Sequence, residues 1–439
     1  MRLIGDIAIA NKQNKNIIAM KFLTEVFQGA TPTIDEFVAE LGDCLPWLKE
    51  YKSTPQDPEW HAEGDVHIHV GMVLDETYKI LATQAQHLSG KRRLSLIMGA
   101  LLHDIAKPKT TKQQEINGIF RTVAPRHASK GRSYLAPKLM GLGLPYDVVE
   151  TSLGLVGYHH DPKQLVNQEK AAGAYQRIAR LADPELLYWL ELADIRGREC
   201  QDKQQQLNRI EMYGLFAREY RAWSRFGSEY RVWRKYIDDE LKDWDRDTKD
   251  LVFSRAIARW TAGKIFTPES EIARSYSYRD SFPQVVVTFG VSGSGKSTWI
   301  RNNLPEYTVI SLDNLREQLT SRSDQSQNSK IVQLAKGQLK SLLRSQSKIA
   351  WDATNIRRDF RQQVIDLSRN YGALVTLVIF HCQEDIYFQR NKERSNSIPE
   401  EVLIRQIEQM EFPELDEGDR IWIVDENGNS LATYGSCVT

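Results

Sequence analysis

The stretch GVSGSGKSTW, residues 290–299, decides the fold of the second half of the chain. It matches the pattern GxxxxGK[ST] and stands between an apolar run, QVVVTF, and a helix-like run. Glycines in such a loop let backbone N–H groups close around phosphate oxygens at the amino end of a helix, where the dipole favours an anion. The stretch therefore predicts a phosphate-binding loop that joins a strand to a helix.

Two side chains of this loop have individual roles. We expect Lys296 to reach the β- and γ-phosphates of a nucleoside triphosphate and Ser297 to hold Mg²⁺. The loop by itself does not separate a kinase from an ATPase or a GTPase. The expected nucleotide-binding set is Gly290, Ser292, Gly293, Ser294, Gly295, Lys296, Ser297 and Thr298.

The two parts of the chain have different hydrophobic patterns. From residue 281 onward, short apolar runs such as YTVISLD and ALVTLVIF alternate with helix-like stretches, as in an α/β domain with buried parallel strands. From about 60 to 260, long amphipathic windows predict helices. The fold class we expect is multidomain, with an all-α domain followed by an α/β P-loop domain with a parallel sheet. The expected divisions are a helical extension at 1–60, a helical domain at 61–205, a helical connector at 206–280 and the P-loop domain at 281–439.

Composition limits the classes of protein. The 58 basic and 58 acidic residues balance, which excludes a globally basic nucleic-acid binder. The four cysteines include no CxxC pair, so they predict neither a disulfide framework nor a thiolate metal site. Neither a signal peptide nor a run of about 18 apolar residues is apparent. We expect a cytoplasmic protein with no membrane partner, and a mobile surface loop at 321–330.

Residues after the next two apolar runs favour phosphoryl transfer. Asp313 follows YTVIS at the carboxyl end of a predicted strand, where ligand sites of α/β sheets gather. Its carboxylate can accept a proton from an attacking hydroxyl, and Arg316, one helical turn on, can hold an acceptor phosphate. Asp352 ends the run KIAWD and could orient Arg316 or a Mg²⁺-bound water. An N-cap aspartate with a surface arginine is the structural alternative for Asp313 and Arg316.

Two further arginines stand before a Ser/Asn-rich break and a proline. Arg390 and Arg394 are spaced i and i+4, which places them on one face if the segment is helical. A hinged segment with two arginines could form a lid over the transferred phosphate, where such arginines are worth roughly 10³ to 10⁵ in rate. An exposed, salt-bridged helix is the alternative.

Together, the P-loop, the D-x-x-R and D-x-T-N motifs and the R-N-x-x-R lid followed by Ile-Pro resemble the polynucleotide 5′-kinase family over residues 281–439. The resemblance implies an NTP with Mg²⁺ bound by Lys296 and Ser297, and Asp313 as general base for a 5′-hydroxyl. It also implies Arg316 on the acceptor phosphate, supported by Asp352. In the same family pattern, the donor phosphate is held by Arg390 and Arg394. Small-metabolite kinases share parts of this layout.

The histidines cluster in the first half, since all nine except His381 lie between residues 61 and 160. An adjacent His-Asp pair, His103 and Asp104, with a distant histidine and a distant aspartate, would form an N/O ligand set suited to a divalent transition ion. Such an ion lowers the pKa of bound water and polarises a phosphoryl oxygen. Thiolates and a dense carboxylate cage are missing from the sequence of this region, which disfavours structural zinc and calcium.

The order H…HD…H…HH…D over residues 60–200 resembles the HD phosphohydrolase superfamily. The resemblance implies a divalent ion such as Mn²⁺, Ni²⁺, Co²⁺ or Zn²⁺ on primary ligands His69, His103, Asp104 and Asp194. It implies a second ion or the scissile phosphate on His127 with one or both of His159 and His160. His67 points away from this set if its segment is helical, and we expect no catalytic role for His61 or His87. Candidate phosphate-binding cations are Lys107, Arg126, Arg196 and Arg198.

The segment 211–236 interleaves basic and aromatic residues, which suits either core packing or base stacking, and core packing is favoured. The two halves together resemble the bacterial HD-Pnk family of end-healing enzymes. That resemblance implies phosphorylation of 5′-hydroxyl ends of RNA or DNA and removal of 2′,3′-cyclic, 2′- or 3′-phosphates, before a ligase acts. The alternatives are a metabolite kinase fused to a small-nucleotide phosphohydrolase, and an NTP-sensing switch that controls an HD nuclease.

Overall fold

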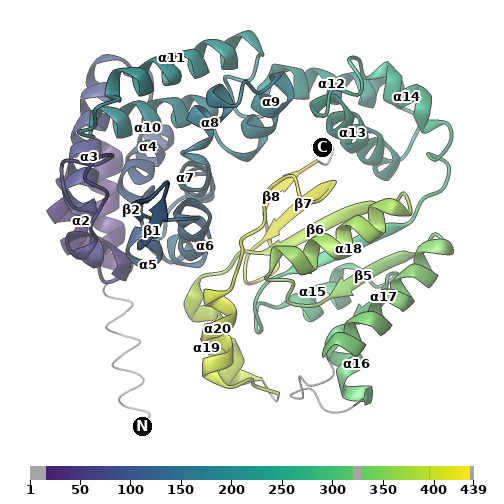
Figure 1. Ribbon diagram of the computed structural model, residues 1–439. Helices are drawn as coiled ribbons and strands as arrows, with labels where there is room; N and C mark the ends of the chain where they lie inside the picture. Colours follow the sequence, from purple (N-terminus) through teal and green to yellow (C-terminus); the bar gives the residue numbers. More distant parts are fainter. Residues whose placement is uncertain (1–15, 320–327, 395, 436–439) are drawn as a thin grey trace. The chain divides into compact units, whose positions relative to one another are not determined.

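The computed structural model describes residues 16–319, 328–394 and 396–435 (Figure 1). The chain divides into two compact units, Met1–Gly227 and Ser228–Thr439. The stretch 206–280, predicted as one connector, is therefore divided between them. Most of the loop predicted at 321–330 and Cys437 lie outside the described residues. Across the three described ranges, no helix is long and apolar enough to span a membrane.

The first unit is a layer of packed helices, shown in purple to teal in Figure 1. Residues 16–28 are helical. The elements that follow are α2 (Ile34–Leu41), η1 (Pro46–Ser53), α3 (Val66–Thr83), α4 (Gly90–Leu102), α5 (Lys107–Thr110), α6 (His127–Leu139), η2 (Met140–Leu142), α7 (Tyr146–Tyr158), α8 (Asp161–Asn167), α9 (Ala172–Leu181), α10 (Pro184–Arg196) and α11 (Lys203–Glu219).

Capping residues begin two of the helices that carry the site histidines and aspartates, and a glycine allows close packing of a third. Asp65 caps α3 by accepting a hydrogen bond of 2.9 Å from the Ile68 N–H, and Asp183 caps α10 ahead of a proline. Helix α4 is apolar along its second half and is buried there. A Cβ at Gly99 would lie 2.8 Å from Leu155 Cδ1, so this glycine lets α4 approach α7 closely.

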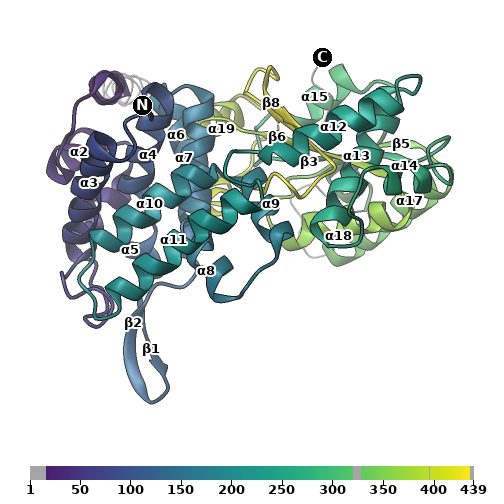
Figure 2. The ribbon, with the colours of Figure 1, turned by 90° about the horizontal axis from the view of Figure 1, so that it is seen from above.

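A β-hairpin not anticipated from the sequence interrupts the helices. Strands β1 (Lys112–Ile116) and β2 (Ile119–Val123) pair antiparallel and project from the helices of the first unit (Figure 2). Asn117 and Gly118 at the turn have φ values of 52° and 80°, which suit the two-residue type I′ turn.

The second unit is built on a six-stranded sheet of order β4-β5-β3-β6-β7-β8. All neighbours are parallel except β7 and β8. The central strands are buried along almost their whole length, as their continuous apolar runs predict. The strands are β3 (Gln284–Phe289), β4 (Thr308–Ser311), β5 (Lys348–Asp352), β6 (Leu374–Phe380), β7 (Arg420–Val424) and β8 (Ser430–Tyr434).

Nine helices of the second unit can be bounded within the described residues: α12 (Gly227–Glu240), α13 (Arg246–Thr261), α14 (Glu269–Ser275), α15 (Lys296–Asn303), α16 (Leu312–Leu319), α17 (Asn328–Arg344), α18 (Arg358–Asn370), α19 (Glu384–Glu393) and α20 (Glu400–Glu408). Helices α12 to α14 share an apolar core that includes Trp233 and Phe253. Trp233 in this core and Tyr213 in the first unit are buried, so these two aromatics of segment 211–236 pack inside the protein.

Polar contacts join helix α13 to the amino ends of the strands. Arg420, the first residue of β7, donates to Asp250 at 2.6 Å and to Asp247 at 2.5 Å. Arg255 donates to the carbonyl oxygen of Gly372, just before β6, at 2.9 Å. Helix α13 therefore lies against the amino edge of the sheet.

Candidate functional site

The phosphate-binding loop follows β3, at the carboxyl edge of the sheet. Gly290, Gly293 and Gly295 have φ values of 156°, 88° and 100°, and the last two lie in the left-handed region that favours glycine. Lys296 begins α15, and its Nζ donates to the carbonyl oxygens of Gly290 and Val291, both at 2.9 Å. The loop is thus closed around its own lysine.

Burial lowers the pKa of Lys296 to about 8. The negative charges of Asp352 and Asp313 oppose this shift, whereas the positive charge of Arg394 adds to it. All three side chains therefore act on the lysine through their charges. A lysine with this pKa is mostly protonated near pH 7 and loses its charge as the pH rises through about 8.

The two predicted carboxylates lie at neighbouring strand ends. Asp352 is the last residue of β5 and pairs in register with Ser311 of β4, just before Asp313. Ser297 Oγ donates to Asp352 Oδ2 at 2.7 Å, and Arg316 donates to Asp313 at 2.6 Å. Asp352 has two predicted roles, to orient Arg316 or to orient a Mg²⁺-bound water. The contact with Ser297 favours the second role, because serine and aspartate are the groups that hold Mg²⁺ in P-loop sites.

Helix α19 lies against the phosphate-binding loop. A Cβ at Gly293 would lie 3.2 Å from the Tyr387 carbonyl oxygen, and a Cβ at Gly295 would lie 3.3 Å from Arg390 Nη1. Arg390 thus reaches the loop. Gln406 of α20 also accepts a hydrogen bond of 2.9 Å from the Ser292 N–H, a contact that no sequence motif marks.

The prediction that Arg390 and Arg394 share one helical face is wrong in its geometry. Helix α19 ends at Glu393, and Arg394 is its C-cap with extended backbone angles of −79° and 141°. The side chain of Asn391 bonds both the N–H and the carbonyl of Ile398, at 3.0 and 2.8 Å. These bonds tie the last turn of α19 to the residue before Pro399.

In the first unit, the four predicted primary ligands converge from helix α3, the turn after α4 and helix α10. His69 Nε2 lies 3.1 Å from Asp194 Oδ1 and 3.7 Å from Asp104 Oδ2. His103 Nε2 lies 3.2 Å from Asp104 Oδ2 and 4.0 Å from Asp194 Oδ1. All four residues are buried. Segments that are distant in sequence therefore meet in one compact N/O cluster.

This cluster fits a metal ion. Within the described residues, neither Nε2 of His69 nor Nε2 of His103 has a hydrogen-bond partner, although carboxylate oxygens lie nearby. A buried ring nitrogen without a partner is costly in a folded protein. Imidazole and carboxylate donors are the set that divalent transition ions accept, so the cost is removed if an ion binds.

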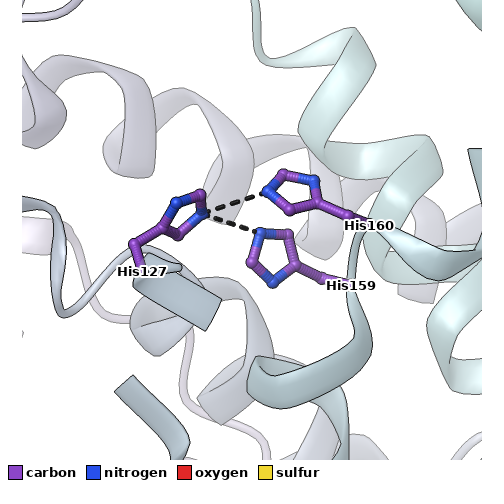
Figure 3. Close-up of side chains that lie close together, drawn as sticks. All are labelled: His127, His159 and His160. Carbon is purple, nitrogen blue, oxygen red and sulfur yellow. Dashed lines mark hydrogen bonds between the residues drawn. The ribbon is translucent and has the colours of Figure 1, made fainter. Parts of the chain in front are cut away.

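Three further histidines form a second group (Figure 3). His127 Nε2 lies 3.2 Å from His159 Nε2 and 3.1 Å from His160 Nε2. His127 Nε2 also lies 3.2 Å from Asp104 Oδ1, which joins this group to the first. Burial and the neighbouring rings hold the pKa values of His159 and His160 well below the usual range, so both rings are neutral at pH 7.

Backbone carbonyls orient three of these rings. The Nδ1 atoms of His103, His127 and His159 lie 2.9, 2.7 and 2.9 Å from the carbonyl oxygens three residues earlier in the chain. A carbonyl can only accept, so Nδ1 carries the proton and donates it. Each Nε2 lone pair is then left for the centre of the site, which is the tautomer that a metal ligand requires.

The sequence did not predict the contacts of Glu63 with His61 and His69. Glu63 Oε1 lies 2.8 Å from His61 Nδ1 and 2.9 Å from His69 Nδ1, so His61, for which no role was predicted, belongs to the cluster. Burial lowers the pKa of His61 to about 3, with the Lys107 charge adding to the shift. His67 instead lies 3.2 Å from Asp35, consistent with the helical spacing.

Cations surround the carboxylates of the cluster. Lys107 Nζ lies 2.7 Å from Asp104 Oδ2, and Arg198 donates to Asp194 at 2.6 and 2.7 Å. Lys163, which was not predicted, lies 2.9 Å from Glu191 and 3.6 Å from Asp194. Burial alone would raise the pKa of Asp194, but Arg198 and Lys163 outweigh it and hold the value well below the usual range. The pKa values of both aspartates lie well below the usual range, so both are ionised.

The remaining two predicted cations lie less close to the cluster carboxylates. Arg196 donates to Gln84 at 3.2 Å, on the exposed side of α10. Arg126 is exposed and precedes α6 with a positive φ of 59°. Among the described residues, the ion pairs of Asp104 and Asp194 are formed with Lys107, Lys163 and Arg198 rather than with these two arginines.

Comparison with known families assigns both domains. The model of the HD domain matches residues 75–184, and the model of the AAA domain matches residues 285–413. A helical HD domain thus precedes a kinase-like P-loop domain with a mostly parallel sheet, and the predicted fold class is confirmed. These domains indicate an enzyme that uses a nucleotide with Mg²⁺ and a metal-dependent hydrolase centre. His69 and Asp194 lie just outside the HD match.

Two solved structures are similar to parts of the chain. A chain of the "Structure of the Pnkp1/Rnl/Hen1 RNA repair complex" shares 22% identity over 29% of this chain and 44% of that chain, with a TM-score of 0.27. The "Crystal Structure of a gluconokinase from Sinorhizobium meliloti 1021" shares 21% identity over 33% of this chain and 83% of that chain, with a TM-score of 0.26. The chain spans less than half the length of the first.

Proposed function

We propose that the protein prepares the broken ends of RNA or DNA for sealing. The P-loop unit phosphorylates 5′-hydroxyl ends with an NTP, and the HD unit removes 2′,3′-cyclic, 2′- or 3′-phosphates. The observation that supports the proposal is that one chain carries both a P-loop with the Ser297–Asp352 contact and a buried His/Asp cluster that includes His103 and Asp104. The motifs that resemble polynucleotide 5′-kinases support the nature of the acceptor.

In the kinase reaction, the 5′-oxygen attacks the γ-phosphorus while the bond to the β-phosphate oxygen breaks. Asp313 accepts the proton of the hydroxyl, and Arg316, 2.6 Å from Asp313, holds the phosphate next to the acceptor sugar. Asp313 is 62% exposed, so an acceptor can reach it from solvent. Lys296, Arg390 and Arg394 neutralise the charge that develops on the transferred group.

In the HD unit, His69, His103, Asp104 and Asp194 would hold the divalent ion, with His127, His159 and His160 on a second ion or on the scissile phosphate. A bound ion supplies an activated water and polarises the phosphoryl oxygen. The protein itself supplies the orientation of the rings and the charges of Lys107 and Arg198. Both cations lie within 2.7 Å of the cluster carboxylates and can attract an anionic substrate. A 5′-phosphate and a free 3′-hydroxyl are the ends that a nucleic-acid ligase joins.

The test uses a short RNA with a 5′-hydroxyl and a 2′,3′-cyclic phosphate, incubated with γ-labelled ATP, Mg²⁺ and Mn²⁺ or Ni²⁺. Lys296→Ala should abolish 5′-labelling and leave 3′ clearance intact, and Asp104→Asn should do the reverse. Lys340→Ala on α17 and Asp75→Ala on α3 are matched controls because both side chains are exposed. Thermal unfolding of each variant checks that the fold is retained.

Other results would select the alternatives. Turnover of free nucleosides or small metabolites, with neither RNA end changed, would contradict the proposal and favour a metabolite kinase with a nucleotide phosphohydrolase. Retention of an NTP effect on the HD activity in Asp313→Ala, without any phosphoryl transfer by the wild type, would favour an NTP-sensing switch.

A further inference from the structure

Helices α13 and α14 of the second unit border a shallow cavity of about 700 Å³. We call it the α13–α14 groove, and its lining includes Arg255, Arg259, Arg274, Glu271, Tyr276 and Tyr278. Three guanidinium groups thus face one carboxylate among the described lining residues. A groove with this charge favours an anionic ligand although the whole chain is neutral.

The single carboxylate is already engaged. Glu271 is only 2% exposed and accepts a hydrogen bond of 2.8 Å from the Tyr278 hydroxyl. Its other oxygen lies 3.3 Å from Arg259 Nε. Glu271 therefore balances Arg259 at most, and Arg255 and Arg274 remain as excess positive charge. Arg274 is exposed.

Aromatic rings and guanidinium groups alternate beside the cavity. The guanidinium carbon of Arg279 lies 3.7 Å from the Tyr276 ring centre and 4.5 Å from the Trp244 ring centre. The guanidinium carbon of Arg255 lies 3.8 Å from the Tyr278 ring centre. Guanidinium groups at these distances hold the rings through cation–π attraction.

Tyr276 differs from the other aromatic residues of this layer. Trp244 and Tyr278 pack on the apolar core of α12–α14, whereas Tyr276 is 67% exposed. With Arg279 beside its ring, Tyr276 is held in place and still presents a large surface to solvent. That surface is suited to a flat, unpaired base.

We propose that the α13–α14 groove binds single-stranded nucleic acid, with backbone phosphates at Arg274 and Arg255 and one base stacked on Tyr276. This inference rests on the proposed function. The groove would bind nucleotides of the acceptor strand that lie several positions from its 5′ end. Single-stranded nucleic-acid sites combine a positive groove with exposed aromatic platforms, and both are present here. A duplex would keep its base faces stacked internally and could not use Tyr276.

The position of the groove predicts which nucleotides it contacts. Arg255 bonds to Gly372 at the amino end of β6, whereas the phosphate-binding loop follows the carboxyl end of β3, and these strands are parallel and in register. A strand of this length spans roughly 20 Å. The groove therefore holds nucleotides several positions from the reacting 5′ end, within the roughly 4–16 nucleotides that single-strand sites cover.

Two measurements test the proposal with the full-length protein. Fluorescence anisotropy of a labelled 20-nucleotide single-stranded RNA, at several salt concentrations, gives the affinity. Arg274→Ala and Tyr276→Ala should each weaken binding roughly 5-fold or more, and Arg274→Ala should lower the salt slope by about 0.7 for each phosphate that is no longer neutralised. Tyr276→Phe, which keeps the ring, and Arg344→Ala, an exposed arginine of α17, should bind as the wild type.

Steady-state phosphorylation then separates this inference from the proposed function. Arg274→Ala and Tyr276→Ala should raise KM for the 20-nucleotide acceptor at least several-fold and leave KM for a nucleoside 3′-monophosphate unchanged. Phosphorylation of the 20-nucleotide acceptor with no effect of either variant would overturn the groove and keep the kinase. RNA binding that depends on Arg274 and Tyr276 without any phosphoryl transfer would keep the groove and overturn the kinase. Dependence on Arg274 alone would overturn base stacking on Tyr276.

Discussion

Ser297 Oγ donates a hydrogen bond of 2.7 Å to Asp352 Oδ2, which joins the helix after the phosphate-binding loop to the end of strand β5. One side chain comes from helix α15 and the other from strand β5, and they are 55 residues apart in sequence. Their contact sets the two groups that we expect to hold Mg²⁺ before a nucleotide arrives. Because these two side chains are already in place, they need little reorganisation when Mg²⁺ and the nucleotide bind.

Replacing Asp352 by Asn should impair phosphoryl transfer through Mg²⁺. Asn keeps the shape of the side chain but removes the charge, and a hydrogen bond to a charged group is worth about 1.5–3 kcal/mol. We expect kcat/KM to fall roughly 10- to 100-fold, with a higher Mg²⁺ concentration at half-maximal rate. The measurement is a Mg²⁺ titration of initial rates, with Asp366→Asn on the exposed face of α18 as control. An unchanged Mg²⁺ dependence would contradict this role of Asp352.

Binding of NTP should take up protons near pH 8. Burial lowers the pKa of Lys296 to about 8 in the free protein, and a bound triphosphate would raise it again. The lysine is protonated in both states well below pH 8, so the uptake disappears there. At pH 8 it is about half a proton, and affinity falls as the pH rises further.

Calorimetry in two buffers of different ionisation enthalpy measures this uptake. Lys296→Arg is the informative comparison, because its guanidinium stays protonated throughout the range. Equal proton uptake in Lys296→Arg and in the wild type would show that another group titrates.

Much of both sites could be predicted because short sequence motifs contain many of their functional residues. The phosphate-binding loop and the His103–Asp104 pair are contiguous, and hydrophobic patterns place them at a strand end and a helix end. Glu63 could not be predicted in the same way. Its approach to His69 Nδ1 at 2.9 Å depends on how the segment before α3 folds back, which no periodicity encodes.

Arg394 and the hairpin show two other limits. The i, i+4 spacing of Arg390 and Arg394 fits a helix, but α19 ends at Glu393 and Arg394 has extended backbone angles. Strands β1 and β2 are largely exposed, so they lack the alternation of apolar and polar residues that marks a half-buried strand. The exact end of a helix and the exposure of a strand are therefore two features that residue spacing alone did not predict.

Replacing Glu63 by Gln should weaken metal binding in the HD unit. A carboxylate on the outer nitrogen of a ligand histidine fixes the ring and raises its basicity, and loss of such a partner costs about 10- to 100-fold in metal affinity. Competition with a fluorescent chelator for Mn²⁺ or Zn²⁺ measures the change without any activity assay. Asp75→Asn, an exposed carboxylate of α3, should bind metal as the wild type does. Equal affinity in Glu63→Gln would mean that Glu63 does not support His69.

Removing Arg361 should strongly destabilise the P-loop unit. Its guanidinium is fully buried and donates to both oxygens of Glu417, at 2.7 and 2.8 Å. Arg361→Ala leaves this buried carboxylate without its counter-charge, which costs about 3–5 kcal/mol. Denaturant unfolding measures the loss, and the exposed Arg344→Ala change should alter the free energy of unfolding by less than about 0.5 kcal/mol. Similar unfolding of both variants would contradict the expectation.

The contacts of Arg420 determine how the kinase could be separated from the rest of the chain. This arginine is 5% exposed, and its carboxylate partners, Asp247 and Asp250, precede the sheet by more than thirty residues. A fragment that begins at residue 281, where the strand pattern starts, would keep the arginine and discard both aspartates. A fragment intended for crystallisation or labelling should therefore begin near Ser228. It then contains Asp247 and Asp250 together with Arg420, whose charge they neutralise.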